Sequence, residues 1–442
     1  MTLSKYIVSM DIPAFVEAVI KRLHNQGFKA YIVGGAIRDM FLGRPATDWD
    51  VATSASPEEV KELFHDIRSF YLKHETVTLV YAGSHYEITT IRSSGDYAHA
   101  VEEDLGHRDF TINAMAYDTD SKLVLDPNGG MEDIIEKTIS AVGDPAERFR
   151  EDPIRLLRAV RIAVELGFGI ENRTLETIRR MSDQLTSVAH ERIRDEFMKI
   201  LMIQRPSNGL KIMRRSGLLI QVLPELLEGF MKRQNSHHHY TIYRHIMETI
   251  DRVEPDPVMR LTALLHDIAK PRVREKIKGK FCFFRHAEES ALLAGEIMER
   301  LRFSNEVIKE VTNLIVFHMV NYNRKWSDGA VRRLIRRVGP DNMDHLILFR
   351  KADLSAHGHV DGNMLLLSEL EKRAKRIRKG SMANRIGDLA IGGDKVMDIL
   401  GISPGPDVGR FLKILLERVT DHPELNTEQG LMDLLKDIKG KY

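Results

Sequence analysis

Two adjacent glycines, an arginine and a pair of aspartates lie close together near the N-terminus, in an order that suits a triphosphate held over a metal ion. Gly34 and Gly35 lack Cβ atoms, so the backbone there can approach an anion closely. Asp48 and Asp50 are two residues apart and would point to one face of an extended strand. Carboxylate pairs of this kind bind Mg²⁺ and leave room for substrate phosphates. We therefore expect Asp48 and Asp50 to be catalytic Mg²⁺ ligands, with the glycines and Arg38 holding the nucleotide.

A strand, a turn and a short helix are expected to position these groups. Residues 31–33 predict a buried strand that runs into the glycines, and residues 36–42 predict a helix whose N-terminal dipole would favour an anion. No Gly-Lys-Ser/Thr follows the strand, which excludes a Walker loop. Strand-like and helical runs alternate over residues 30–125, and helical spacing prevails from about residue 150 onward. The expected fold class is α+β, with a mixed head followed by helices.

Two further segments carry groups that could hold a nucleotide. Arg108 can hold a phosphate, while Asp109 or Asn113 can hydrogen-bond sugar hydroxyls and so favour NTP over dNTP. Asp152 and Arg155 are three residues apart, so on a helix they would share a face and present an acceptor beside a fork of donors. Cytosine and adenine each place an exocyclic amine beside a ring nitrogen, which such a pair can bond. Guanine and uracil present a carbonyl oxygen and a ring N–H in these positions and are disfavoured.

Length and composition narrow the class of protein. With 442 residues the chain is too long for one ordinary core, and about three or four domains are expected. Lys and Arg number 65 and Asp and Glu number 64, so the net charge of +1 decides nothing about an RNA partner. The single cysteine, Cys282, excludes an intramolecular disulfide and a thiolate zinc cluster, which makes the cytoplasm the expected compartment. No apolar run approaches a membrane span, so no membrane association is expected.

One cluster of positive charge admits two interpretations. Six basic residues crowd into a short stretch: Lys372, Arg373, Lys375, Arg376, Arg378 and Lys379. They indicate either a solvated helix face or a surface that contacts RNA.

Residues 34–50 resemble the first motif of the class II tRNA nucleotidyltransferase and bacterial poly(A) polymerase family. Residues 108–117 resemble its second motif, and residues 151–161 resemble its fourth. The resemblance implies Mg²⁺-dependent nucleotidyl transfer to RNA, with Asp152 and Arg155 as a protein template that selects CTP or ATP. Arg158, in the same motif, is expected to belong to the nucleotide site.

The resemblance also implies a division into four regions and an RNA partner. We expect a head over residues 1–140, a helical neck over 141–205, a helical domain over 206–360 and a C-terminal tail over 361–442. The basic helical surface and the tail would grip the acceptor–TΨC arm of tRNA by shape and phosphate charge.

A second set of metal-ligating residues lies downstream in apparently helical stretches. His245, the adjacent pair His266-Asp267 and the distant Asp353 resemble the metal-binding pattern of the HD phosphohydrolase superfamily. Imidazole and carboxylate together suit a divalent metal that activates water. His286 and His318 could complete a second metal position, whereas residues 237–239, three histidines, are interpreted as an exposed turn. The sequence leaves open whether this site is active and which metal it holds.

The subtype is predicted from a short loop. Residues 72–78 resemble the Lys-His-Gly-Thr-Val segment of the tRNA enzymes rather than the Arg-Arg-Phe element of the poly(A) polymerases. CCA-adding and A-adding enzymes of the family insert a loop with an Asp-Gly-Arg-x-Pro element before the second motif, and residues 90–104 lack it. The resemblance therefore favours addition of two cytidines over full CCA addition.

The sequence leaves other functions open. The chain could be a full CCA-adding enzyme, an A-adding enzyme or a poly(A) polymerase. The HD site could be a second or even the main activity, with the head reduced to an RNA-binding module. A protein that only binds RNA would turn over no NTP, and the oligomeric state is also left open.

Overall fold

The computed structural model describes residues 4–7, 11–46, 48–71, 75–91, 97–234, 240–356, 363–380, 383 and 385–439. The predicted turn over residues 237–239 lies outside them, as do residues 72–74 and 92–96 of the segments used to predict the subtype. By its internal contacts the chain divides into two units, Met1–Val222 and Leu223–Tyr442. The predicted four-part division is finer than this and stays a prediction.

The first unit is built on a mixed sheet of eight strands in the order β1-β8-β7-β2-β3-β6-β5-β4. The strands are β1 (Ser4–Ile7), β2 (Ala30–Val33), β3 (Trp49–Thr53), β4 (Arg68–Tyr71), β5 (Thr76–Tyr81), β6 (Ser84–Thr90), β7 (Ala116–Asp118) and β8 (Leu123–Asp126). Only the pairing of β3 with β6 is parallel among these neighbours. Strands β5 and β6 form a hairpin, with Ala82 and Gly83 at positive φ in its two-residue turn.

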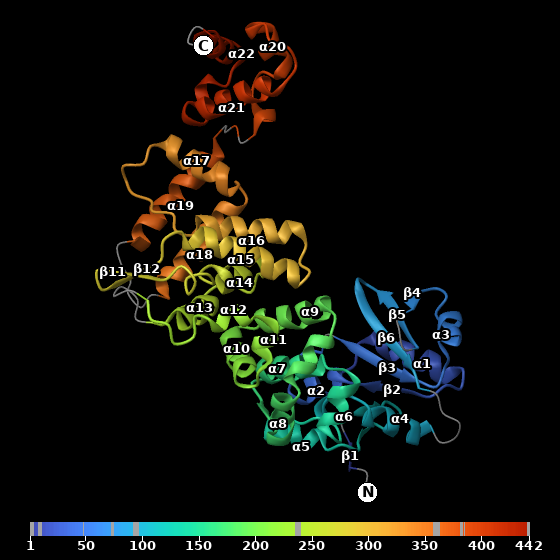
Figure 1. Ribbon diagram of the computed structural model, residues 1–442. Coiled ribbons are helices and arrows are strands. Elements are labelled where there is room, and N and C mark those ends of the chain that lie inside the picture. Colours follow the sequence, from blue (N-terminus) through green and yellow to red (C-terminus); the bar gives the residue numbers. More distant parts are fainter. Residues whose placement is uncertain are drawn as a thin grey trace. The chain divides into compact units, whose positions relative to one another are not determined.

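Helices cover the sheet and bury its apolar face (Figure 1). They are α1 (Ala14–Asn25), α2 (Gly35–Phe41), α3 (Pro57–Leu63) and α4 (Tyr97–Gly106), and a further helix, α5 (Gly130–Glu136), follows β8. Helix α4 places Tyr97, Val101 and Leu105 in one core cluster with Val33 and Ala116 of the sheet. Burial of these apolar side chains fixes α4 directly beside the strands that carry the site.

A helical layer follows the head in the same unit. Its helices are α6 (Pro145–Glu151), α7 (Arg155–Leu166), α8 (Asn172–Arg180), α9 (His190–Leu201), α10 (Pro206–Arg215) and α11 (Leu218–Val222). Two short strands, β9 (Thr138–Ile139) and β10 (Gly169–Ile170), pair in parallel. Helix α7 is amphipathic: Leu156, Val160 and Ala163 are buried, while Arg155 and Arg158 lie three apart on the opposite face.

In its described residues the second unit is helical apart from one hairpin. Its helices are α12 (Pro224–Leu227), α13 (Ile242–Ile250), α14 (Pro257–Leu265), α15 (His286–Arg300), α16 (Asn305–Phe317), α17 (Asp328–Val338), α18 (Asn342–Ser355), α19 (Asn363–Lys379), α20 (Gly393–Leu400), α21 (Pro406–Asp421) and α22 (Glu428–Lys439). The strands β11 (Glu275–Ile277) and β12 (Lys280–Cys282) form the hairpin. The α+β class is thus confirmed, with small strands inside the region expected to be wholly helical.

The basic cluster of α19 serves largely to hold helices together. Arg373 and Arg376 both form ion pairs with Asp328 of α17, and Arg378 pairs with Asp344 of α18. These ion pairs neutralise much of the positive charge of the cluster over residues 372–379. In the described part of the chain, no helix combines the length and apolarity that a bilayer crossing requires.

Candidate functional site

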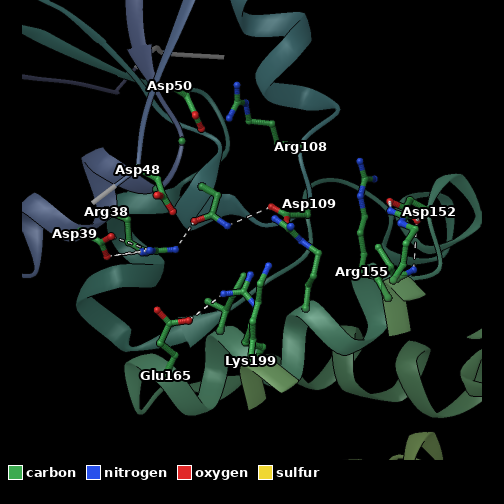
Figure 2. A pocket seen from close by; sticks show the side chains of 18 of the residues that line it. Arg38, Asp39, Asp48, Asp50, Arg108, Asp109, Asp152, Arg155, Glu165 and Lys199 are labelled. Carbon is green, nitrogen blue, oxygen red and sulfur yellow. Dashed lines mark hydrogen bonds and ion pairs between the residues drawn. The ribbon is translucent and has the colours of Figure 1, made fainter. Parts of the chain in front are cut away.

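A cavity of about 1070 Å³ opens in the first unit, between the sheet and helices α7 and α9. Every head and neck residue singled out from the sequence lines it: Gly34, Gly35, Arg38, Asp48, Asp50, Arg108, Asp109, Asn113, Asp152, Arg155 and Arg158. In Figure 2, Asp152 and Arg155 stand at the end of the cavity opposite Asp48 and Arg38. The space is at the upper end of the range for small-molecule sites, and it is large enough for a nucleoside triphosphate.

Position 34 requires glycine because of its backbone conformation and because of the side chains beside it. Its φ is +83°, and it precedes α2 immediately after β2. A Cβ built there would lie 3.1 Å from a guanidinium nitrogen of Arg108 and 3.1 Å from the Oδ2 atom of Asp50. Only glycine lets the chain turn left-handed while these two side chains close over it.

Asp48 and Asp50 both face the cavity, as the strand spacing predicted, with Asp48 just before β3 and Asp50 within it. Burial raises the pKa of Asp50 to about 6; Glu87 and Asp48 push this pKa the same way, and Arg108 opposes them. Glu87 lies beside Asp50 in the parallel pairing of β3 with β6. This excess of negative charge and the oxygen donors fit a bound divalent cation.

A chain of hydrogen bonds links the head to α7. Arg38 donates to Asp39 and, over 2.8 Å, to the Oδ1 atom of Asn113. Asn113 donates to Asp109, whose other carboxylate oxygen accepts from Arg158 over 2.8 Å. Burial would raise the pKa of Asp109, but the Arg158 guanidinium and the hydrogen bonds outweigh burial and lower it. These residues are therefore held in place by one another.

The expectation that Asp152 and Arg155 share a helix face is wrong. Asp152 caps the end of α6 in an extended conformation, and α7 begins only at Arg155. Pro153 disfavours helical geometry at the preceding residue, which explains the break. Both side chains still line the same cavity, although they do not lie on one helix face.

Each member of this pair has a different partner. Asp152 accepts two hydrogen bonds from Arg192, over 3.1 and 2.8 Å. Arg155 donates to Glu151 over 2.8 Å and to the backbone carbonyls of Arg148 and His107. The Asp152 carboxylate is thus held by Arg192, and the Arg155 guanidinium is held by Glu151 and two backbone carbonyls.

Sequence reasoning missed several groups that line the cavity or border it. Arg161 donates to the buried Glu196 of α9 over 2.7 Å, and Lys199 forms an ion pair with the same carboxylate. Arg161 continues the three-residue spacing of Arg155 and Arg158, a signal that could have found it. Glu87 carried no local signal, because its role depends on which strands pair in the sheet.

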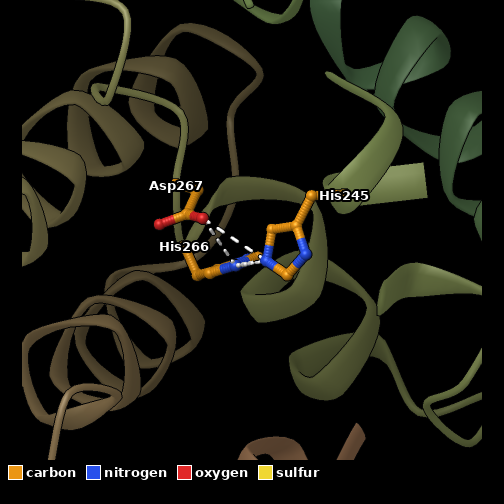
Figure 3. A group of neighbouring side chains, drawn as sticks. All are labelled: His245, His266 and Asp267. Carbon is orange, nitrogen blue, oxygen red and sulfur yellow. Dashed lines mark hydrogen bonds and ion pairs between the residues drawn. The ribbon is translucent and has the colours of Figure 1, made fainter. Parts of the chain in front are cut away.

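The second unit buries the other predicted group between α13, α14 and α18. The Nε2 atom of His245 lies 3.0 Å from Asp353, 3.2 Å from His266 and 3.5 Å from Asp267. Figure 3 shows the side chains of His245, His266 and Asp267 pointing toward one another. These ligand atoms lie close enough to share one ion. Two ligands each about 2.1 Å from an ion are separated by roughly 3.0 to 3.4 Å.

Asp267 also belongs to a second triad. Its Oδ1 atom lies 3.6 Å from His286 and 3.8 Å from His318, and these three residues form another group compatible with a metal. Within the described ranges, this oxygen and the Nε2 atom of His286 have no hydrogen-bond partner. Buried polar atoms without partners fit ligands that await a cation.

The imidazoles are set for metal binding by their own helices. The Nδ1 atoms of His266, His286 and His318 each hydrogen-bond the carbonyl oxygen three residues earlier, over 3.0, 2.8 and 2.6 Å. This arrangement places the proton on Nδ1 and leaves Nε2 as a ligand. Burial lowers the pKa of His318 to about 3, so this ring stays neutral.

Comparison with known proteins gives one consistent set of relatives. Residues 30–140 match the poly A polymerase head domain, residues 167–229 the probable RNA- and SrmB-binding site of polymerase A, and residues 238–359 the HD domain. A CCA-adding enzyme of Lactococcus lactis is 32% identical over 94% of this chain and 95% of its own length. One of Streptococcus thermophilus is 29% identical over 95% of this chain and 96% of its own.

A solved structure supports the same relationship. The crystal structure of the Bacillus stearothermophilus CCA-adding enzyme in complex with CTP superposes with a TM-score of 0.72 at 25% identity. The match covers 97% of this chain and 98% of that one.

Proposed function

Because this chain belongs to the family of CCA-adding enzymes, which are tRNA nucleotidyltransferases, we propose that it adds cytidine residues from CTP to the 3′ end of tRNA and stops before the terminal adenosine. The observation that carries this proposal is the single cavity that joins two strand-borne carboxylates to the pair Asp152 and Arg155. The solved relative bound to CTP supports CTP as the nucleotide.

Asp48 and Asp50 act as the catalytic carboxylates. When Mg²⁺ is bound by them, it neutralises the triphosphate and lowers the pKa of the RNA 3′-hydroxyl. The 3′-oxygen then forms a bond to the α-phosphorus of CTP, the bond from that phosphorus to the bridging oxygen breaks, and pyrophosphate leaves. Asp50 lies beside Gly34, and the positive charge of Arg108 opposes the burial that raises the pKa of this carboxyl.

Asp152 and Arg155 select the base. Each oxygen of Asp152 accepts one hydrogen bond from Arg192 and keeps acceptor capacity for an exocyclic amine. Arg155 has five N–H donors, and Glu151 and two carbonyls hold its orientation while the remaining donors serve a ring nitrogen. Uracil or guanine would place a carbonyl oxygen against the Asp152 carboxylate and a ring N–H against the donors of Arg155.

The network across the cavity holds the sugar and phosphates. Arg108 contacts the phosphates, while Asp109 and Asn113 present oxygen and nitrogen to the ribose hydroxyls. Arg158 and Arg38 fix the orientation of these two groups through the hydrogen bonds described above. Gly34 and Gly35 leave room for the triphosphate to approach the backbone.

The proposal that addition stops after two cytidines rests on the short segment between β6 and Arg108. Strand β6 ends at Thr90 and α4 begins at Tyr97. Tyr97, Val101 and Leu105 of α4 are buried in the core of the head, so this helix supplies no long loop that could reorient the template pair toward ATP. Full CCA addition, the activity for which the relatives are named, is the alternative.

The partner is tRNA, gripped by its acceptor–TΨC arm. Lys372 and Lys379 form no ion pair within the residues that the structure describes, in contrast to Arg373, Arg376 and Arg378 of the same helix. They can release counterions from RNA phosphates without breaking an internal contact.

The test is a tRNA that lacks its three 3′-terminal nucleotides, incubated with CTP alone, with ATP alone or with both. Two cytidines with CTP, and the same product when ATP is added, are expected on a sequencing gel. A third nucleotide that depends on ATP would contradict the CC-specific proposal, and long adenosine tails would favour a poly(A) polymerase.

We further propose that the buried histidine–aspartate cluster is a phosphohydrolase site. The observation in favour is the pair of triads that share Asp267, with the Nδ1 atoms of His286 and His318 bonded to backbone carbonyls so that their Nε2 atoms face Asp267. Divalent metal bound by His245, His266, Asp267 and Asp353 would activate water for attack on a phosphate ester. Opening of a 2′,3′-cyclic phosphate to the phosphomonoester, or release of inorganic phosphate from a 2′-phosphorylated nucleotide, each dependent on added divalent metal, is the expected result.

A further inference from the structure

A basic hairpin, residues 274–285, lies between the two halves of the buried metal cluster in the sequence. It contains five cations, Arg274, Lys276, Lys278, Lys280 and Arg285, and one carboxylate, Glu275. Three phenylalanines, Phe281, Phe283 and Phe284, share the same stretch. The whole chain is nearly neutral, so this is a local concentration of positive charge and aromatic rings.

The hairpin is an exposed and well-defined structure. Strands β11 and β12 pair with Lys276 opposite Phe281 and Ile277 opposite Lys280. Lys278 and Gly279 both have positive φ and close the hairpin with a two-residue turn. Figure 1 draws the two strands at the periphery of the helical unit. Phe284 is 62% exposed.

The cations of the hairpin are available to a ligand. Within the described residues, Lys276, Lys278 and Lys280 form neither an ion pair nor a side-chain hydrogen bond, and all three are exposed. Arg274 stacks on the Phe281 ring, with its guanidinium carbon 3.5 Å from the ring centroid. In α19, by contrast, arginines are tied to aspartates.

The hairpin leads directly into the metal cluster. Arg285 is followed directly by His286, whose Nδ1 atom hydrogen-bonds the carbonyl oxygen of Phe283. At the other end, Lys270 forms a 2.6 Å ion pair with Asp267, and its ammonium lies 5.7 Å from the Phe283 ring. The end of the hairpin is therefore continuous in the chain with a residue of the cluster.

We propose that the basic hairpin binds single-stranded RNA, so that the ligand of the HD unit is a polynucleotide end rather than a free nucleotide. Unpaired lysines match the phosphates of a strand, and an exposed aromatic ring stacks on a base whatever its identity. An acidic protein segment would use the lysines but leave the Phe284 ring without a role. The inference rests on the proposed hydrolase only for the fate of the RNA end, because binding requires no hydrolysis.

The test compares two double variants of the full chain for binding of a short labelled oligouridylate that ends in a 3′-phosphate. Lys276→Glu/Lys280→Glu should weaken binding about tenfold and lower the slope of log affinity against log salt by about 1.4, since a single strand loses about 0.7 per phosphate contact. Lys309→Glu/Lys325→Glu, two exposed lysines of the same unit outside the hairpin, should bind as the wild type does.

A second readout maps the contact. An oligonucleotide with 4-thiouridine should crosslink under ultraviolet light to the peptide that contains Phe281 and Phe284. Unchanged affinity in the hairpin variant, crosslinks confined to other peptides, or equal competition by polyglutamate at matched charge would each overturn the proposal. Absence of phosphate release from all substrates would contradict the hydrolase while leaving these binding results to stand or fall alone.

Discussion

The cavity of the first unit and the cluster of the second both gather carboxylates and nitrogen bases, yet they are built in opposite ways. In the cavity, charged groups are partly exposed and paired with partners on other elements; Arg192 is 54% exposed and Asp152 is 31% exposed. In the cluster, His245, His266 and Asp267 are each about 1% exposed, and their ligand atoms point at one another. A large substrate must enter the cavity and replace some of these internal contacts, whereas a metal ion is small enough to be enclosed by its ligands.

The two regions also differ in the direction in which the pKa of a buried carboxyl is shifted. Asp50 has a raised pKa because burial and neighbouring carboxylates disfavour its charge, so this site is short of positive charge. The pKa of Asp267 lies well below its ordinary value: burial would raise it, but His266 and Lys270 outweigh burial. The cavity gains from a cation that arrives with the substrate, whereas the cluster holds its carboxylate ionised in advance.

The largest effect is expected from removing a carboxylate of the cavity. Asp48→Ala should lower cytidine incorporation into tRNA by about 10³-fold, because a metal ligand contributes several kcal/mol to stabilising the transition state. Phosphate release by the second unit should be unchanged. Asp120→Ala, which removes an exposed aspartate of the same unit, is the matched control. Residual incorporation near the wild-type rate would show that the cavity is not the transferase site.

The two triads of the cluster can be separated by counting metal. Asp267→Asn should abolish binding of both ions, because its carboxylate belongs to both triads, whereas His318→Ala should remove one. Elemental analysis of the purified protein after dialysis against Mn²⁺ measures the stoichiometry. Asp341→Asn, at an exposed aspartate, should leave it unchanged. Equal metal content in Asp267→Asn and His318→Ala would argue against a shared ligand.

A glycine substitution can separate backbone strain from crowding. Gly34→Ala should reduce incorporation by about 10- to 100-fold, because its methyl group would press on Asp50 and Arg108 in addition to the strain of about 1–2 kcal/mol at positive φ. Gly43→Ala carries the same kind of strain but meets nothing within 4 Å. Steady-state rates with CTP and melting temperatures of both variants make the comparison. Similar rates in the two variants would rule out the contact as the cause.

The smallest effect is expected in nucleotide choice. Arg192→Lys removes the bidentate support of Asp152, so discrimination between CTP and UTP should fall by about tenfold. The ratio of kcat/KM values for the two nucleotides measures it. Arg194→Lys, on the same helix, should keep the wild-type ratio. If Arg192→Lys lowers both values equally, Arg192 supports the fold of the site rather than the choice of base.

Local patterns predicted much of this molecule, and packing decided the rest. The turn at Gly34, the helix that follows it and the shared orientation of Asp48 and Asp50 follow from period and backbone freedom within one short segment. The link between Asp152 and Arg192 spans forty residues and exists only because α9 packs on α7. The helix expected through Asp152 failed because Pro153 restricts the residue before it.

Charge was the least predictable feature. The cluster over residues 372–379 was interpreted either as a solvated helix face or as an RNA surface, and α17 and α18 supply aspartates that pair with three of its arginines. The basic hairpin of β11 and β12 was overlooked, although five cations and three phenylalanines within residues 274–285 are visible in the sequence. A count of charges cannot tell which cations find partners in the fold.

The most direct test of the account uses a tRNA that already ends in two cytidines, incubated with enzyme, ATP and Mg²⁺ and analysed by intact mass. A tRNA lacking both cytidines, given CTP, serves as the positive control and should gain two cytidylate masses. The account predicts that the first tRNA keeps its mass. A gain of one adenylate would contradict it and assign the chain to full CCA addition.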